Sequence, residues 1–278
     1  MNLIDSHIHF WDPKHLRYTW LDDLPTLNKP FLPEHLPTSG DDWTMEKLVF
    51  VQCDCLAEQG LDEARWVSSL AEGDKRVQGI VAFAPLEVED ARSYLQSLKD
   101  LPLVKGVRRL IQSEPLGFST QPQFVRNVQM LGEFGYSFDI CIRHYQMNDV
   151  IELVRQCPDI AFVLDHIGKP DIKNGVLDPW RDQIRTLASF SNVMCKISGL
   201  VTEADTQNWT PADLQPYIDH TLEVFGIDRL MYGGDWSVVE LASTYERWIE
   251  TAMAAAASLS DAEKHKLFYE NARKFYRL

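Results

Sequence analysis

The sequence is poor in positive charge and has no long apolar run. Its 278 residues include 27 lysines and arginines against 41 aspartates and glutamates, a formal net charge of −14. A nucleic-acid partner requires clustered Lys and Arg, so this balance argues against one. No apolar stretch approaches membrane-spanning length, and the N-terminus lacks the basic and apolar regions of a signal peptide. These absences predict a cytoplasmic protein without a membrane partner.

Cysteine is scarce and is not spaced as in a disulfide framework. The chain has five cysteines, an odd number: Cys53, Cys55, Cys141, Cys157 and Cys195. We therefore expect buried free thiols in a reducing compartment. A metal held by Cys53 and Cys55 is the alternative for that pair.

Short apolar runs rich in β-branched residues recur along the chain, with longer amphipathic segments between them. The pattern predicts strands near residues 2–8, 47–53, 77–84, 103–111, 136–142, 160–166, 193–198 and 229–234. It predicts helices over 60–73, 88–99, 121–134, 147–156, 179–190, 213–225, 240–256 and 261–276. Almost entirely apolar strands, such as those near 47–53 and 160–166, are typical of a parallel sheet covered by helices.

This alternation predicts the α/β class, as one (β/α)8 barrel domain over residues 1–278. An open doubly wound sheet is the alternative, but no GxGxxG follows the first strand. We expect a distorted barrel, because residues 11–46 form a long segment rich in proline and aromatics after the first strand. Long loops of this kind commonly form the lids or walls of functional sites.

The first predicted strand ends with two histidines, His7 and His9. Alternate residues of a strand share a face, so the two imidazoles point the same way. They can supply two nitrogen ligands to one metal ion or two donors to one anionic group. A short HxH pair also occurs as ordinary strand histidines, so the rest of the chain must decide between these interpretations.

Further polar residues stand at the carboxyl ends of the predicted strands, where barrels of this kind place their active sites. His166 follows the sixth strand and Asp235 the eighth. With His7 and His9 they make a nitrogen and oxygen ligand set suited to one Zn²⁺, and Asp235 can take a proton from bound water as general base. The alternatives are a helix N-cap for Asp235 and a hydrogen-bonded core residue for His166.

Four cationic residues lie near the same strand ends. Arg108 and Arg109 are neighbours on a strand and face opposite ways, so at most one points into the site. We expect this to be Arg109, which is nearer the strand end, and expect Arg108 to be solvated or salt-bridged. Lys169 and Lys196 are each candidates for substrate binding or for a structural charge.

Five blocks of the sequence resemble the amidohydrolase superfamily, amidohydrolase 2 type, over essentially the whole chain. They are DSHIHFWDP (5–13), KGVRR (105–109), VLDHIGKP (163–170), KISGL (196–200) and FGIDRLMYGGDW (225–236). DHIGKP and GGDW are the most specific. Together the blocks are similar to the branch of sugar-lactone hydrolases that includes L-fuconolactonase and L-rhamnonolactonase. The resemblance maps the family's metal-binding positions onto His7, His9, His166 and Asp235.

The sequence departs from the two-metal members of that superfamily, which use a Lys or Glu on strand 4 and a His at the end of strand 5. Here strand 4 ends in arginines, Lys105 lies too early, and His144 lies past the usual position. The resemblance therefore implies one divalent metal ion or none, with zinc the best fit, and no organic cofactor.

The resemblance implies a hydrolase that opens the lactone ring of a sugar acid by water attack on the carbonyl. Asp235 is then the general base. His7, His9 and His166, with or without Zn²⁺, stabilise the developing oxyanion together with a cationic residue such as Arg109. Trp11, Trp20 and Trp236 are expected to bind the apolar faces of the sugar ring, with packing of the 11–46 loop as their alternative. The remaining substrate-binding candidates are Lys169 and Lys196.

Two rival functions stay open at this stage. A Zn-dependent decarboxylase is supported by the same superfamily, and a barrel of this kind can also bind a sugar acid without converting it. The identity of the lactone, its ring size and its stereochemistry stay open, and a homo-oligomer is possible.

Overall fold

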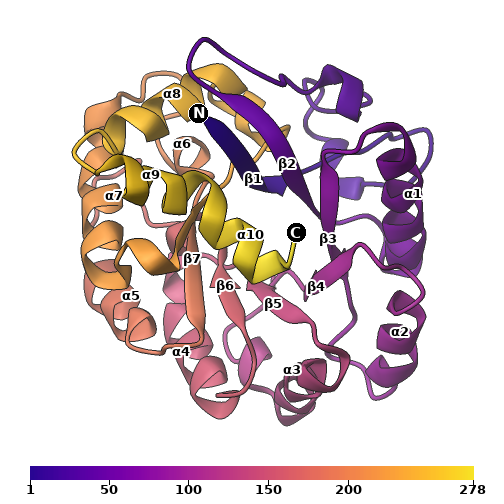
Figure 1. The fold of residues 1–278 in the computed structure, drawn as a ribbon. Coiled ribbons are helices and arrows are strands. Elements are labelled where there is room, and N and C mark those ends of the chain that lie inside the picture. The colour runs from indigo at the N-terminus through magenta and orange to yellow at the C-terminus, as the bar shows by residue number, and fades with distance from the viewer.

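The computed structural model describes residues 1–278 and contains eight parallel strands, hydrogen-bonded in chain order into a barrel (Figure 1). The strands are β1 (Asn2–Ile8), β2 (Thr44–Val51), β3 (Val77–Phe83), β4 (Val104–Arg108), β5 (Ser137–Ile140), β6 (Phe162–Leu164), β7 (Val193–Ile197) and β8 (Leu230–Tyr232). Each lies where the apolar pattern predicts a strand. The (β/α)8 prediction is confirmed.

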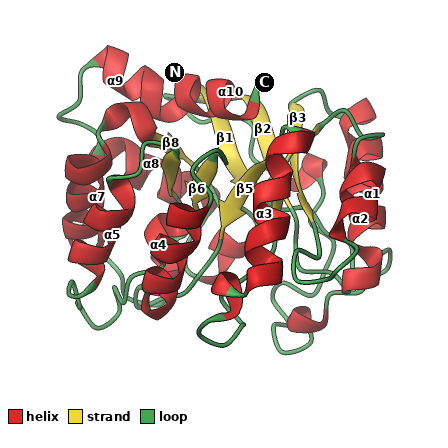
Figure 2. Cartoon of the chain, turned by 90° about the horizontal axis from the view of Figure 1, so that it is seen from below, coloured by secondary structure: helices red, strands yellow, loops and turns green.

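Helices surround the barrel (Figure 2). They are α1 (Gly60–Gly73), α2 (Ala91–Leu98), α3 (Pro122–Phe134), α4 (Met147–Gln156), α5 (Trp180–Ala188), α6 (Leu200–Glu203), α7 (Pro211–Phe225), α8 (Tyr245–Ala255), α9 (Asp261–His265) and α10 (Asn271–Tyr276). The predicted helix over 261–276 is divided into α9, a π-helical turn and α10, and α6 was not predicted. No helix has the length and apolar character needed to cross a membrane.

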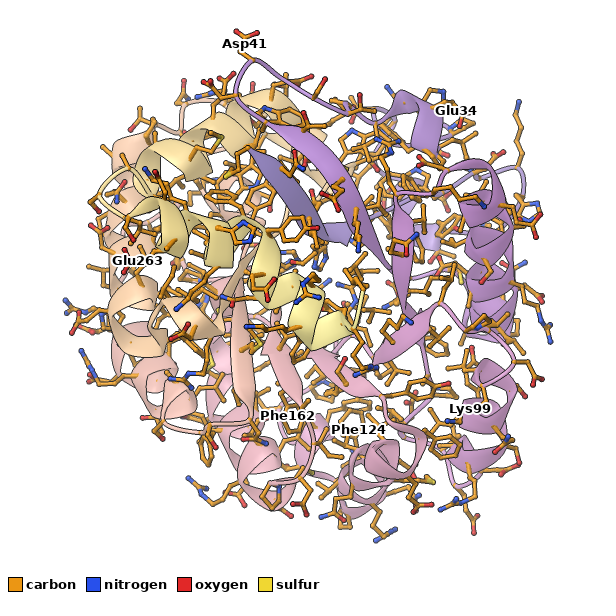
Figure 3. All side chains as sticks on the ribbon, in the orientation of Figure 1. Glu34, Asp41, Lys99, Phe124, Phe162 and Glu263 are labelled. Carbon is orange, nitrogen blue, oxygen red and sulfur yellow. The ribbon has the colours of Figure 1, made fainter.

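The main core lies between the strands and the outer helices. Phe124 of α3, Phe138 of β5 and Phe162 of β6 are fully buried there, with successive ring centroids 6.0 and 6.1 Å apart. Figure 3 shows Phe124 and Phe162 inside this layer, whereas Asp41 extends from the periphery. All five cysteines are also buried and form no disulfide, as predicted.

The C-terminal helix α10 covers the amino end of the barrel (Figures 1 and 2). Its Ala272 and Tyr276 are fully buried against Ile4, Val49 and other strand side chains that point into the barrel. The barrel interior is therefore a packed core at this end, and only the opposite, carboxyl end is free to hold a site.

Strands β1 and β8 meet at the carboxyl end through two backbone hydrogen bonds, which we call the seam. Asp235 N donates to His7 O (2.8 Å), and His9 N donates to Trp236 O (2.6 Å). Asp5 supports the seam by accepting from Gly234 N (2.9 Å). A Cβ at Gly234 would lie 2.4 Å from Asp5 Oδ2, so this close approach requires glycine. The seam thus joins the two ends of the barrel sequence beside the predicted ligands.

The proline-rich segment after β1 folds back on itself beside the carboxyl end. It contains short 3-10 turns at Thr19–Leu21 and Pro33–His35, and β2 begins at Thr44, three residues earlier than predicted. Trp11 anchors it, because its indole Nε1 donates to the carbonyls of Leu27 (3.0 Å) and Lys29 (3.0 Å). This long loop therefore has a defined structure.

Candidate active site

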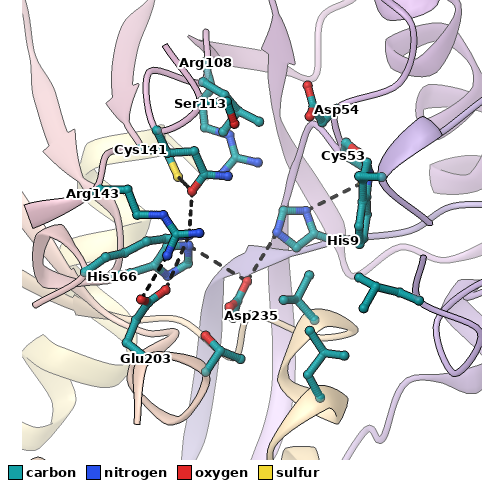
Figure 4. Close-up of a pocket in the computed structure, with 18 of the residues that line it drawn as sticks. His9, Cys53, Asp54, Arg108, Ser113, Cys141, Arg143, His166, Glu203 and Asp235 are labelled. Atoms are coloured by element: carbon teal, nitrogen blue, oxygen red, sulfur yellow. Dashed lines mark hydrogen bonds and ion pairs between the residues drawn. The ribbon is translucent and has the colours of Figure 1, made fainter. Parts of the chain in front are cut away.

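A cavity of about 350 Å³ opens at the carboxyl end of the barrel (Figure 4). Its lining comes from the segments that directly follow the strands, including His9 after β1, His166 after β6 and Asp235 after β8. Trp11 and Trp20 of the long loop form part of its apolar wall. The cavity therefore lies where a barrel of this class places its active site.

Three of the four residues predicted as metal ligands, His7, His166 and Asp235, have ligand atoms within 4.8 Å of one another, and His9 adjoins them. Oδ1 of Asp235 lies 3.3 Å from Nε2 of His9, 3.7 Å from Nε2 of His7 and 4.0 Å from Nε2 of His166. The Nε2 atoms of His7 and His9 are 3.2 Å apart. Three imidazole nitrogens and one carboxylate oxygen thus face a common centre, although the fully buried His7 lies beneath the cavity surface.

The other ring nitrogen of two of these histidines is held by a neighbouring oxygen. Nδ1 of His9 lies 2.7 Å from the carbonyl of Val51, and Nδ1 of His166 lies 2.9 Å from Oγ of Ser198. A carbonyl can only accept, so the neutral ring of His9 carries its proton on Nδ1 and turns the lone pair of Nε2 toward the centre. Such outer contacts orient the histidine ligands of metal sites.

The loop after β6 presents His166 through an unusual backbone conformation. Four consecutive residues, His166 to Lys169, have positive φ angles of 55°, 48°, 77° and 50°. This region is disfavoured for a β-branched residue such as Ile167. Trp180 holds the turn by donating from its indole Nε1 to the carbonyl of Ile167 (2.8 Å). Packing thus stabilises a conformation that aims His166 at Asp235.

Beneath His7 lies a group of four buried charged residues, the buried tetrad: Arg108, Asp139, Asp165 and Lys196. Lys196 Nζ lies 2.7 Å from Asp139 Oδ2 and 3.0 Å from Asp165 Oδ1. Arg108 Nη1 lies 3.0 Å from Asp165 Oδ2. Two cations and two carboxylates balance, as buried charges require.

The tetrad contacts His7 on both ring nitrogens. Nδ1 of His7 lies 3.2 Å from Lys196 Nζ and 3.3 Å from Asp165 Oδ1, and Nε2 lies 3.4 Å from Arg108 Nη1. Although burial opposes ionisation of Asp165, Lys196 and His7 hold the pKa of this carboxyl well below its usual range. Lys196 is therefore a structural charge behind His7 and does not line the cavity, which contradicts its prediction as a substrate-binding residue.

Burial sets the protonation of the site. It lowers the pKa of His7 and of His9, and lowers that of His166 to about 4. Burial also opposes the charge on Asp235, but His166 and the hydrogen bond to His9 hold the pKa of Asp235 below its usual range. At neutral pH the centre therefore combines neutral imidazoles with an ionised carboxylate. This is the ligand state that a divalent metal requires, so the residues fit one Zn²⁺.

The prediction that Arg109 faces the site is wrong. Arg108 lines the cavity, whereas Arg109 points outward and binds Glu87 (2.9 Å) and Glu114 (2.6 Å). β4 ends at Arg108, three residues before the end of the strand predicted near 103–111, so Arg109 already lies outside the strand. Side chains alternate along a strand, so the inward position falls on Arg108 and the outward one on Arg109.

The three predicted tryptophans have different places. Trp11 and Trp20 line the cavity, with Leu24, Val238 and Leu241. Trp236 does not, because its ring is buried against Phe10 and Phe31, with centroids 6.0 and 5.4 Å apart. The prediction that Trp236 binds substrate is therefore wrong, and its packing instead supports the seam.

Several polar cavity residues were missed by the sequence reasoning. They are Asp54, Gln112, Ser113, Arg143, Thr202 and Glu203. All lie in loops shortly after strands, or in α6, which follows β7. A place soon after a predicted strand was the only feature of the sequence that could have identified these residues as part of the cavity. Lys169, which was predicted, does line the cavity, and its Nζ donates to Gln112 Oε1 (2.7 Å).

Comparisons with known proteins agree with this architecture. The amidohydrolase family model matches residues 4–278. L-fucono-1,5-lactonase of Burkholderia multivorans is 31% identical over 272 residues, which cover 91% of this chain and 90% of that protein. L-rhamnono-gamma-lactonase of Scheffersomyces stipitis is 23% identical, with 99% and 98% covered. The crystal structure of a B. multivorans amidohydrolase with bound zinc is 29% identical, covers 100% of both chains and has a TM-score of 0.90. The chain belongs to the amidohydrolase family.

Proposed function

We propose that this protein hydrolyses the lactone of a sugar acid. The observation that carries the proposal is the convergence of Asp235 Oδ1 with three imidazole Nε2 atoms, all within 4.0 Å, at the base of a cavity. An ionised carboxylate beside a reactive centre is the group needed to take a proton from water. The lactonase names of the two relatives support the class of substrate.

One Zn²⁺ suits the donor set of His7, His9, His166 and Asp235, and we propose a single ion. When bound, such an ion lowers the pKa of water and polarises a carbonyl oxygen. A second group of potential ligands, Cys141, Asp165 and His166, shares His166 with the first. Its Asp165 is already bound by Arg108 and Lys196, which argues against a second ion there.

The chain's own residues then divide the reaction between them. Asp235 accepts the proton of the attacking water, and His166 remains neutral beside it. Arg108, in place of Arg109, stabilises the negative charge that develops on the carbonyl oxygen, because its guanidinium reaches the imidazole cluster. Trp20 offers apolar surface to a sugar ring, with the fully buried Trp11 packed against it, and Gln112 and Lys169 offer hydrogen bonds to its hydroxyls.

The test is acid release from a panel of aldono-1,4- and 1,5-lactones, with Asp235→Asn as the matched variant. We expect hydrolysis above the spontaneous rate, and a loss in kcat on the order of 10³-fold or more in the variant, since a carboxamide cannot accept the proton. Circular dichroism checks that the variant is folded. Removing metal from the protein with a chelator and then adding Zn²⁺ back measures how far lactone hydrolysis depends on the ion.

Three results would contradict the proposal. Full activity in the Asp235→Asn variant would remove this residue as the base. Carbon dioxide release from an unsaturated acid, without lactone hydrolysis, would identify a decarboxylase. Binding of a sugar acid by calorimetry, without any turnover, would identify a binding protein.

A further inference from the structure

One wall of the cavity holds two cations that share a single carboxylate. Arg143 Nη1 lies 3.2 Å from Glu203 Oε2, and Lys169 Nζ lies 3.8 Å from Glu203 Oε1. Figure 4 shows Arg143 and Glu203 facing each other across this wall. All three residues line the cavity, and the side chains of Lys169 and Glu203 are only 14% and 15% exposed. We call them the Glu203 triad.

The fold holds Glu203 and Lys169 of the triad in place. Glu203 ends the short helix α6, and its backbone carbonyl accepts from Lys173 N (3.0 Å). Gly199 precedes α6 with φ 65°, and a Cβ there would lie 2.4 Å from Nδ1 of His166. Lys169 is held in the left-handed turn after β6 and also donates to Gln112. The carboxylate is thus positioned by two segments that also carry the site.

The cavity lining contains equal numbers of cations and carboxylates. Its lining contains three cations, Arg108, Arg143 and Lys169, and three carboxylates, Asp54, Glu203 and Asp235. No cation of the lining is uncommitted, because Arg108 binds Asp165 while Arg143 and Lys169 bind Glu203. A carboxylate or sulfonate on a substrate ring would lose water here without gaining a free cationic partner, which is unfavourable. Neutral hydroxyls can accept from the same cations without displacing Glu203.

We propose that Glu203 is a specificity-determining residue that restricts the cavity to uncharged polyhydroxy lactones. It does so by occupying Arg143 and Lys169, which would otherwise bind an anionic substituent. This inference rests on the proposed lactonase function for its substrate class. By the same pairing, the acid that ring opening produces gains no free cation from Arg143 or Lys169.

The experiment compares the wild type with Glu203→Gln, which frees both cations while keeping a similar shape. Substrates are an uncharged aldono-1,4-lactone and an aldaro-1,4-lactone, which carries one ring-substituent carboxylate. We expect the ratio of kcat/KM for the charged over the uncharged lactone to rise by about tenfold or more in the variant. The inhibition constant of the aldonate product should fall in parallel, and added salt should reduce both changes.

Two control variants sharpen the result. Glu203→Asp keeps the charge and should restore the wild-type preference. Glu87→Gln also frees an arginine, but that arginine, Arg109, lies outside the cavity. Neither the ratio of kcat/KM nor the inhibition constant of the aldonate should therefore change. An unchanged ratio in Glu203→Gln, or equal use of both lactones by the wild type, would overturn the inference.

Binding separates this inference from the proposed function. The affinity for aldarate and aldonate can be measured by calorimetry without turnover. If no lactone is hydrolysed but Glu203→Gln binds aldarate more tightly than the wild type, the proposed reaction fails and the role of Glu203 in charge selection stands. Equal aldarate affinity in the two proteins would overturn that role whether or not lactones are hydrolysed.

Discussion

At the scale of single residues, two adjacent arginines have opposite environments. Arg108 is 4% exposed and touches His7, whereas Arg109 lies outside the cavity between two glutamates. The choice of Arg109 as the residue nearer the strand end was wrong, because β4 ends at Arg108 and Arg108 takes the inward face. A one-residue difference in a strand exchanges the inward and outward faces.

These two arginines provide a matched pair of variants. We expect Arg108→Met to lower kcat for lactone hydrolysis by about 100-fold or more, since it removes a cation next to the developing oxyanion. Arg109→Met should leave kcat close to the wild-type value. Steady-state kinetics measures both, and Arg108→Lys tests whether charge alone is sufficient. A larger loss of kcat in Arg109→Met than in Arg108→Met would refute the assignment.

At the scale of elements, α1 contributes a buried acid to the segment after β2. Both carboxylate oxygens of Glu63 lie 3.2 Å from Cys53 N, and burial raises the pKa of Glu63 to about 8 from an ordinary value of 4.5. Between these values the folded protein keeps a proton that the unfolded chain has lost. The free energy of unfolding contributed by Glu63 is therefore present below about pH 4.5 and is lost as pH rises toward about 8.

Glu63→Gln removes this dependence. Relative to the variant, the wild type should lose stability steadily from pH 5 to pH 8, because only the wild type must bury a charge or retain a proton at the higher pH. Urea unfolding across that range measures the difference. Glu58→Gln, at an exposed position shortly before α1, is the control. Parallel stability curves for the wild type and Glu63→Gln would contradict the expectation.

Most helices and strands could be predicted from the periodicity of apolar residues. The features that were not predicted are short and depend on a few residues. The apolar runs of the strands and the amphipathic spacing of the long helices are properties of many residues, so single exceptions do not hide them. Helix α6 has four residues and follows a left-handed Gly199, which is too short for any periodic signal. The four positive φ angles after β6 likewise depend on tertiary packing, including the hydrogen bond from Trp180.

The candidate site was predictable to the extent that it lies at strand ends. His7, His9, His166 and Asp235 each follow or end a strand, so topology brings them together. Glu203 ends helix α6, and its cavity position depends on how the segment after β7 folds, whereas Arg143 was missed although it lies as close to β5 as Asp235 lies to β8. Trp236 lies in the seam and turns into the core, although it directly follows Asp235. A position close to a strand end therefore indicates a site residue but does not identify one by itself.

At the scale of the whole molecule, the barrel is closed at its amino end by the C-terminal helix. Tyr276 of α10 is fully buried, and its hydroxyl donates to Asp139 Oδ2 (2.6 Å), a member of the buried tetrad. Through Asp139 and Lys196, a continuous line of contacts runs from α10 to His7. Helix α10 at the amino end of the barrel and the candidate site at the carboxyl end are therefore parts of one packed interior.

Removal of the Tyr276 ring from α10 should destabilise the protein. We expect Tyr276→Ala to lower the free energy of unfolding by about 3–5 kcal/mol, because it leaves a cavity the size of an aromatic ring in the core. Tyr276→Phe keeps the ring and should lose only about 1 kcal/mol, for the missing hydrogen bond. Urea denaturation distinguishes the two variants. Equal losses for alanine and phenylalanine would mean that the hydroxyl, and not the packing, carries the contribution.

The seam between β1 and β8 also has a consequence for biosynthesis. His7 and His9 are translated long before Asp235, which follows β8 and pairs with them across the seam. A nascent chain that stops before β8 has two imidazoles with no carboxylate opposite them and an unpaired edge on β1. The set of four candidate ligands is therefore complete only after Asp235 has been translated, and chains that terminate before β8 should be inactive.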